Sequence, residues 1–240
     1  MKHLIIIAIL GLAIAPAMAQ KTVINDPNAA LRAVKGFHGI TVSNAIDVYL
    51  SAGDQQTVAV SAVDTKWRDR IRTEVKDGIL NIWVEREGWL NWGMTNHKLK
   101  VYIAFTDLDK LSASGASNIY VDGVISGSSL DISLSGASDF KGAIFVGQLK
   151  LNQSGASDAH IAGTVTGVAT VHSSGASDLK AYELVAENCN VHASGASDVY
   201  ITVNKELNVH ASGASSIYYK GPAVARDLHS SGASNISKKS

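Results

Sequence analysis

The sequence predicts an all-β protein, a right-handed parallel β-solenoid, and two observations carry this prediction. The tetrapeptide Ser-Gly-Ala-Ser occurs seven times, and successive copies begin 18 to 21 residues apart. A period near 20 residues is typical of solenoids, in which each repeat is one coil stacked on the last. Residues before each tetrapeptide alternate between apolar and polar, as in a strand with one buried face. Parallel crossovers of this kind are expected to be right-handed. The copies begin at Ser114, Ser135, Ser154, Ser174, Ser194, Ser212 and Ser231.

Three columns of residues, each at a constant distance from its tetrapeptide, are predicted to face the interior. The third residue before the first Ser is always apolar: Leu111, Ile132, Leu151, Val171, Val191, Val209 and Leu228. The fifth residue after it is apolar as well: Ile119, Phe140, Ala159, Leu179, Val199, Ile217 and Ile236. The Ala of each tetrapeptide is expected to point inward and pack on its neighbours at a corner. Replacing Ala176 by Leu would then overpack the core.

Composition and charge limit the class of partner. The chain has 240 residues, with 21 acidic and 21 basic side chains. A net charge of zero argues against a nucleic-acid partner, which would require a basic surface. The single cysteine, Cys189, lies in an inward column and is expected to be a buried apolar residue rather than a reactive thiol.

Residues 1–19 are predicted to be a cleaved signal peptide. Lys2 and His3 precede an apolar run of 12 residues, and Ala17-Met18-Ala19 provides a small-x-small cleavage site. The run is shorter than the ~20 residues that a membrane span needs, and no other segment qualifies. We therefore expect export to the periplasm, the outer membrane surface or the extracellular space, with no transmembrane segment in the mature chain.

The remaining chain divides into a lead-in, an N-terminal region and the repeats. Residues 20–35 form a polar lead-in, residues 36–110 are predicted to be β-rich coils with a cap, and residues 111–240 are the seven-repeat solenoid. We expect 36–240 to be one continuous domain. Asp77-Gly78 predicts a two-residue hairpin turn, and Asp64 is a candidate helix N-cap. Leu99, Val101, Ile103 and Phe105 alternate as the buried side of a strand.

These motifs resemble a known family. Phe37-x-x-Ile40-x-Val42, Ile46-Asp-Val-Tyr-Leu50, Asp77-Gly78-x-Leu80-x-Ile82 and the repeated Ser-Gly-Ala-Ser are similar to the putative auto-transporter adhesin, head GIN domain family, over roughly residues 36–237. The resemblance implies a secreted or envelope-associated right-handed β-solenoid of unestablished function. It supplies no catalytic residues.

The first candidate site is a histidine column two residues before the tetrapeptide, formed by His172, His192, His210 and His229. Imidazoles on adjacent strands, about 5 Å apart, can share a transition metal. Side chains on parallel strands point the same way rather than converging, and no carboxylate is expected beside these. We therefore favour a solvated polar ladder, and predict no metal and no cofactor.

The second candidate is an acidic column four residues after the first Ser, formed by Asp139, Asp158, Asp178 and Asp198. Stacked carboxylates repel one another unless something compensates their charge, and calcium is one such compensator. The Gly-Gly-x-Gly-x-Asp repeat of calcium-binding solenoids is absent from this sequence. We favour hydrogen bonds from local backbone N–H groups at the corner.

Two sets of aromatic residues are candidates for ligand binding. One set is the column six residues after the first Ser, which consists of Tyr120, Lys141, His160, Lys180, Tyr200 and Tyr218. These side chains suit contact with a sugar or a protein. The alternative is that they form the ordinary exterior of a β-sheet. The non-repeating segment 88–97 carries Trp89, Leu90 and Trp92. These side chains form either a contact surface or a lid over the apolar end of the solenoid.

The sequence favours a non-enzymatic binding or adhesion-type module of the cell envelope, whose partner is a surface glycan or protein. A carbohydrate-active enzyme on a β-helix scaffold is the main alternative, and a purely structural envelope protein is another. A hydrolase needs a distinct carboxylate pair, whereas the carboxylates here are equivalent members of a repeat. The sequence does not identify the oligomeric state.

Overall fold

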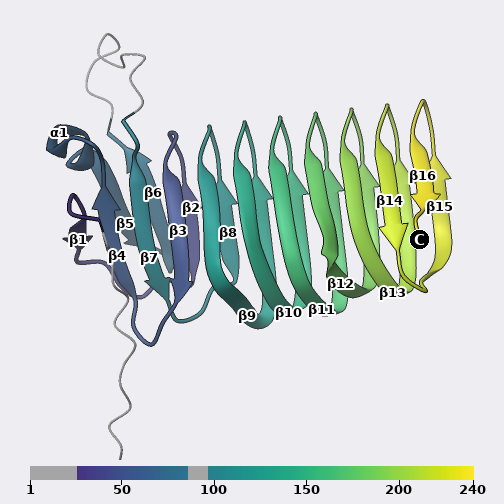
Figure 1. Cartoon of the computed structure of the whole chain (residues 1–240), viewed down its shortest axis with the longest axis horizontal. Helices are drawn as coiled ribbons and strands as arrows, with labels where there is room; N and C mark the ends of the chain where they lie inside the picture. Colours follow the sequence, from purple (N-terminus) through teal and green to yellow (C-terminus); the bar gives the residue numbers. More distant parts are fainter. Residues whose placement is uncertain (1–25, 86–96) are drawn as a thin grey trace, which may run out of the picture.

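The computed structural model describes residues 26–85 and 97–240, and it shows a sheet of 16 strands wound into stacked coils, with one short helix in these two ranges (Figure 1). Adjacent long strands pair in parallel and in register, so the predicted parallel β-solenoid is confirmed. The elements are β1 Ala30–Arg32, β2 Gly39–Val42, β3 Asp47–Ala52, β4 Thr57–Ser61, α1 Thr65–Arg68, β5 Ile71–Lys76, β6 Ile79–Val84, β7 Lys100–Phe105, β8 Lys110–Ala113, β9 Asn118–Leu134, β10 Asp139–Gln153, β11 Asp158–Ser173, β12 Asp178–Ala193, β13 Asp198–Ala211, β14 Ser216–Lys220, β15 Val224–Ser230 and β16 Asn235–Lys238.

Each long strand bends and contributes to two faces of its coil. In β9, residues 118–122 pair with β3, whereas residues 131–134 pair with β8. We call the outer surface of the segments after each tetrapeptide the tyrosine face, and that of the segments before it the histidine face. The tetrapeptides form the narrow loops along the upper edge in Figure 1, and the strands bend along the lower edge.

The interior follows two of the three predicted columns. Leu111, Ile119 and Phe140 have no exposed surface, and the other members of their columns are equally buried up to Ile217. Each Val, Leu, Ile or Phe side chain in these columns contributes about 1.5–3 kcal/mol on burial. The exceptions lie in the last coil, where Leu228 is 44% exposed and Ile236 is half-buried. Cys189 is fully buried, as predicted.

The third predicted column is wrong, because the corner turns the adjacent residue inward instead. Ala176 is exposed and Ser177 is fully buried, and the same exchange occurs at every corner from Ala116 to Ala214. The Ser177 hydroxyl donates a hydrogen bond to the carbonyl oxygen of Ser174 at 2.9 Å, which closes the turn. A buried hydroxyl is stable only with such a partner, so the last Ser of the tetrapeptide is the inward residue. Small size alone was therefore a misleading guide.

From the second tetrapeptide on, the Gly is required for two reasons. Gly195 has φ +77°, a left-handed conformation that favours glycine. A Cβ atom at this position would lie 2.5 Å from the carbonyl oxygen of Gly175 in the preceding coil. The same carbonyl accepts a hydrogen bond from the Ala196 N–H at 2.7 Å. The corners therefore stack backbone on backbone.

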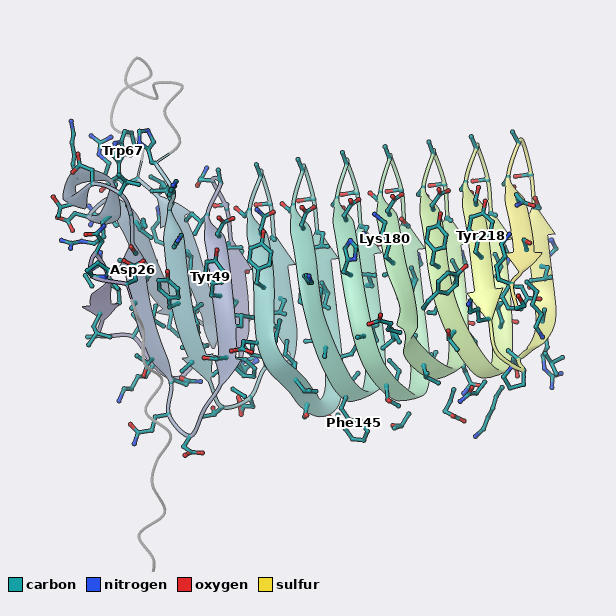
Figure 2. All side chains as sticks on the ribbon, in the orientation of Figure 1. Asp26, Tyr49, Trp67, Phe145, Lys180 and Tyr218 are labelled. Atoms are coloured by element: carbon teal, nitrogen blue, oxygen red, sulfur yellow. The ribbon has the colours of Figure 1, made fainter. Side chains whose placement is uncertain are left out.

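Differences in coil length are absorbed at the bends, not at the corners. The pairing of β10 with its neighbours shifts register between Lys141 and Ala143 and between Val146 and Leu149, both on the bend. Residues that flank the corners stay aligned from coil to coil. Phe145, at the lower edge in Figure 2, is 55% exposed. The bend therefore tolerates variation that the stacked corners do not.

The N-terminal coils are not stacked in sequence order. On one face β2 lies between β6 and β8, and on the other β3 lies between β7 and β9. Strands β6 and β7 therefore stack on the outer side of β2 and β3, although they follow β2 and β3 in the chain. The chain then returns to add β8 and β9 on the opposite side.

Antiparallel strands cover the outer side of this N-terminal stack. Strand β4 pairs with β7 and β5 pairs with β6, while β1, from the segment before residue 36, pairs with β4. The predicted hairpin at Asp77-Gly78 is confirmed, with Lys76 opposite Ile79. Asp64 caps α1 as predicted, since its carboxylate accepts a hydrogen bond from the Lys66 N–H at 2.8 Å. Leu99, Val101, Ile103 and Phe105 are all buried, also as predicted.

Candidate functional site

The tyrosine face carries stacked aromatic rings at both ends of one column. Tyr200 and Tyr218 stack with ring centroids 5.1 Å apart. At the other end Tyr120 stacks on Tyr49 at 5.3 Å, and Tyr49 stacks on Tyr102 at 5.4 Å. Sequence reasoning missed Tyr49 and Tyr102. The signal was present, because Asp47-Val-Tyr49 repeats the pattern Asn118-Ile-Tyr120 and the two segments are paired.

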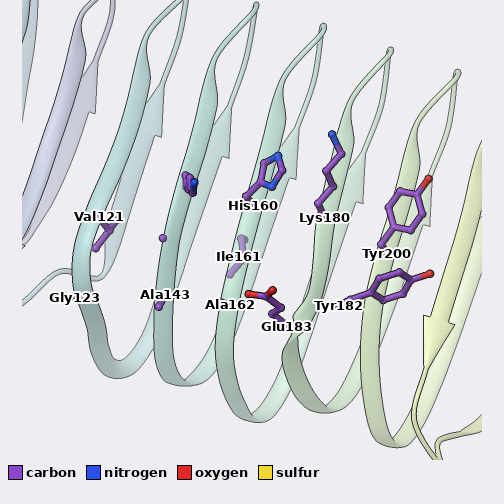
Figure 3. Close-up of a pocket in the computed structure, with 12 residues that line it drawn as sticks. Val121, Gly123, Ala143, His160, Ile161, Ala162, Lys180, Tyr182, Glu183 and Tyr200 are labelled. Carbon is purple, nitrogen blue, oxygen red and sulfur yellow. The ribbon is translucent and has the colours of Figure 1, made fainter. Parts of the chain in front are cut away.

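Between the two aromatic ends the face is hollowed. The hollow has a volume of about 720 Å³, and Lys141 is one of its lining residues. His160 and Lys180 also lie along it (Figure 3). It forms because three of its lining residues, Gly142, Ala143 and Ala162, have little or no side chain. Small residues at the start of the bend therefore create a concave surface bordered by longer polar and aromatic side chains.

Tyr182 and Glu183 complete one side of this hollow, and sequence reasoning missed both. Figure 3 shows them below Lys180 and Tyr200. The ring of Tyr182 meets that of Tyr200 edge to face at 5.4 Å, and the ammonium group of Lys220 lies 5.0 Å from the centre of the Tyr182 ring. These residues lie on the bend, where the irregular spacing of the repeat gives no sequence signal for their position.

Tyr200 and Tyr102 of this column are hydrogen-bond donors at neutral pH. Partial burial raises the pKa of Tyr200, and the carboxylates of Asp198 and Asp178 raise it further. Desolvation, together with the hydrogen bond to Asp26, raises the pKa of Tyr102 to about 12. The phenol of Tyr102 donates to a carboxylate oxygen of Asp26 at 2.9 Å. The hydroxyl groups of Tyr200 and Tyr102 therefore remain protonated over the physiological range.

The acidic column lies at the start of the same strands. The Asp158 N–H donates to the Asp139 carboxylate at 3.3 Å, and the Asp178 N–H donates in the same way to Asp158. The bonded N–H group belongs to the next coil rather than to the residue's own corner. The Lys180 ammonium lies 3.8 Å from the Asp178 carboxylate and partly compensates its charge. Asp198, the fourth member, pairs in register with Asp178.

The histidine face carries the predicted ladder. His172 stacks on His192 at 4.9 Å, His192 on His210 at 5.0 Å, and His210 lies 4.9 Å from His229. Partial burial and the two neighbouring imidazoles lower the pKa of His192. The expectation that no carboxylate lies beside this column was wrong, because Asp227 is 2.7 Å from the Nε2 atom of His229. Asp227 and His229 are two residues apart on one strand, so their side chains lie on the same face.

Three residues of the predicted ligand-binding set, Trp89, Leu90 and Trp92, lie outside the described residues, as does the predicted signal peptide of residues 1–19. Cys189 is not a candidate nucleophile, because burial raises the pKa of its thiol to about 12. Within residues 26–85 and 97–240, no helix is long and apolar enough to cross a membrane.

Comparison with known proteins places this arrangement in a family. A family model described as "Putative auto-transporter adhesin, head GIN domain" matches residues 36–223, most of the chain. The chain belongs to this family. The match spans both the N-terminal coils and most of the repeats, so the family fold includes the coils that lack the tetrapeptide. Among curated proteins, none matches the sequence.

Solved structures share the fold at low sequence identity. A putative adhesin from Bacteroides fragilis is 20% identical with a TM-score of 0.77, covering 88% of this chain and 96% of its own. A putative adhesin from Parabacteroides distasonis is 21% identical with a TM-score of 0.66 and the same coverage. A protein of that organism described as a putative lipid binding protein is 19% identical with a TM-score of 0.59, covering 88% and 98%. Similarity at this level establishes the fold, and members of the fold carry different functional names.

Proposed function

We propose that this chain is an exported, non-enzymatic adhesion-type module of the cell envelope, and that its tyrosine face binds a surface glycan. The observation that carries the proposal is the hollow between the two aromatic ends of that face, bordered by Lys180, Tyr182 and Tyr200. Membership of a family described as putative adhesins supports a binding role. The predicted signal peptide of residues 1–19 supports export.

The chemistry of the hollow suits a sugar chain. Aromatic rings offer flat apolar surfaces with a polar tip, and ligand sites combine such surfaces with a few placed polar groups. Tyr182 and Tyr200 supply the rings, and Lys141, His160 and Lys180 supply donors for hydroxyl or acidic groups. Tyr120 and Tyr200 are four coils apart, roughly 19 Å at the interstrand spacing. The open face therefore accommodates an extended chain rather than a single small molecule.

The alternative of a glycoside hydrolase finds less support in this hollow. Hydrolysis of a glycosidic bond commonly uses two carboxyl groups on either side of the scissile bond. Of the described residues that line the hollow, Glu183 alone carries a carboxylate. A single carboxylate can orient a sugar hydroxyl but does not provide the acid and base pair.

Binding of purified protein to an array of bacterial and host glycans tests the proposal. We expect retention of specific glycans with no change in their mass, and at least about tenfold weaker binding when Tyr182 and Tyr200 are both replaced by Ala, since ring stacking contributes of order 1 kcal/mol for each ring. His172→Ala removes an exposed ring from the opposite face and is the matched control. Cleavage of the glycans would identify an enzyme. Binding to cells that is abolished by protease treatment alone would identify a protein partner.

Export is tested separately in the native cell. Fractionation with and without external protease should find the chain outside the cytoplasm and lacking residues 1–19. Recovery of full-length chain in the cytoplasm would contradict this part of the proposal. Digestion by external protease would place the chain on the cell surface, and protection would place it in the periplasm.

A further inference from the structure

The geometry of the histidine face points to a transition-metal site at its C-terminal end. We propose that His210, Asp227 and His229 bind a divalent ion of the zinc class. One atom from each residue, an imidazole nitrogen or a carboxylate oxygen, lies within 4.8 Å of the others. The Nε2 atom of His229 is 2.7 Å from one Asp227 oxygen, and the Nε2 atom of His210 is 4.0 Å from the other.

These three residues converge because of the pairing of β13 with β15. His210 pairs with His229 across the two strands, and Asp227 is two residues before His229 on the same strand. Side chains at positions i and i+2 of a strand share a face, so the carboxylate lies beside both rings. A ladder of parallel side chains does not converge by itself, and Asp227 is the group that brings the three together.

The rest of the histidine column lacks this carboxylate. The residues that correspond to Asp227 in the three preceding coils are Thr170, Asn190 and Asn208. The amide of Asn208 donates to that of Asn190 at 2.9 Å, so these two residues are bonded to each other. The stacked pair His172 and His192 therefore offers imidazoles alone. The ligand set of two imidazoles and one carboxylate is confined to the last two coils.

The ligand set and its exposure fit a zinc-class ion. Zinc binds imidazole nitrogen and carboxylate oxygen at about 2.0–2.2 Å in tetrahedral geometry, which places ligand atoms about 3.3 Å apart. The side chains of His210, Asp227 and His229 are 48%, 51% and 68% exposed, so they have room to close the remaining distance by rotation. Arg226, the nearest cationic neighbour in the chain, pairs with Glu206 at 3.1 Å.

Three protein ligands leave one tetrahedral position open. In zinc sites of this type that position is taken by water or by an external ligand. The site lies on the outer surface, on the opposite face from the hollow, so an ion here is accessible to a second molecule. Zinc binding at this site does not depend on glycan binding by the tyrosine face, and either activity can be absent without the other.

Isothermal titration of the purified chain with Zn²⁺ in chelator-free buffer tests the site. We expect saturable binding of one ion per chain. Asp227→Asn keeps the shape of the side chain and should weaken zinc binding at least about tenfold. Loss of a residue that only orients a metal ligand already weakens metal binding about tenfold or more, and loss of a direct ligand should weaken it at least as much. His229→Gln should have a similar effect. The melting temperature without zinc should stay unchanged in both variants, because both positions are exposed.

Two matched controls separate this site from nonspecific binding to histidines. His172→Ala removes a stacked ring from the same column, and His38→Ala removes the ring of an exposed His–carboxylate pair with Asp109. Both should leave zinc binding unchanged. Anomalous diffraction from a zinc-soaked crystal should show the ion between His210 and His229. Absence of saturable binding, or equal losses from His172→Ala and Asp227→Asn, would overturn the proposal.

Discussion

The first coil, residues 39–52, and the repeat coils build the same corner from different residues. Val42 pairs with Ala113 and Asp47 with Asn118, so the segment 43–46 stacks on the tetrapeptide that begins at Ser114. Ser43-Asn44-Ala45-Ile46 is therefore an eighth corner with a divergent sequence. Asn44 adopts φ +72° where the repeats use Gly, and Ile46 is fully buried where the repeats bury Ser.

This difference shows that corner sequence depends on the coil that precedes it. A Cβ atom on Gly115 would meet its nearest neighbour, the Asn44 N atom, at 3.4 Å, an ordinary contact. A Cβ atom on Gly195 would lie 2.5 Å from a carbonyl oxygen. Gly is thus a conformational preference at the first tetrapeptide and a steric requirement in the later ones. Asn tolerates the left-handed region better than most residues do.

The largest expected effect comes from adding a methyl group to an inner corner. Gly195→Ala should lower the free energy of unfolding by about 2–5 kcal/mol, combining the left-handed backbone cost with overpacking. Gly115→Ala has the same backbone cost without the close contact and should lower it by about 1–2 kcal/mol. Urea denaturation measures both. Equal losses would show that the corners are not held by close stacking.

The next effect concerns the buried hydroxyl. Ser197 is fully buried and donates to the Ser194 carbonyl at 2.9 Å, so Ser197→Ala should destabilise by about 1–3 kcal/mol. Ser154, the exposed first residue of another tetrapeptide, is the control, and Ser154→Ala should change stability by less than about 0.5 kcal/mol. Thermal melting of the two variants compares them. A larger loss for Ser154 would contradict the assignment of the inward residue.

Alkaline titration extends the comparison to the tyrosine column. The pKa of Tyr102 is raised to about 12 from 10 in the N-terminal coils, where its phenol donates a hydrogen bond to the Asp26 carboxylate. A group with a raised folded pKa contributes stability below its unfolded pKa and loses it as pH rises through the folded value. Stability should therefore fall between pH 10 and about 12. Tyr102→Phe should weaken this dependence of the free energy of unfolding on pH. If the pH profile of the variant matched that of the unmodified protein, ionisation of Tyr102 would not be coupled to unfolding.

The smallest effects are expected where the corner is open. Ala176 is exposed, so Ala176→Leu should change the free energy of unfolding by less than about 0.5 kcal/mol, in contrast to the overpacking that its sequence predicts. Asn44→Gly should likewise change it by less than about 1 kcal/mol, because both residues accept the left-handed conformation. Melting temperatures check both variants. A large loss of stability in Ala176→Leu would show that the Ala column faces the interior.

The sequence predicted the fold class because the repeat is a local pattern. Alternation on both sides of the tetrapeptide identifies strands with one buried face, and a fixed period stacks them. It could not identify the inward residue at the corner, since Ala176 and Ser177 are both small and the direction of each depends on backbone angles set by Gly175. It also could not place β6 and β7 outside β2 and β3, because that order depends on contacts between residues that are far apart in the sequence.

The candidate sites divide in the same way. By itself the sequence determined the columns of Tyr120, Tyr200 and the histidines, because equal spacing from the tetrapeptide places equivalent residues above one another. Only the tertiary structure decided that Tyr49 joins the tyrosine column, that Tyr182 and Glu183 lie beside Lys180, and that Asp227 meets two imidazoles. Those arrangements arise at bends and in divergent coils, where register is set by packing between strands rather than by the repeat.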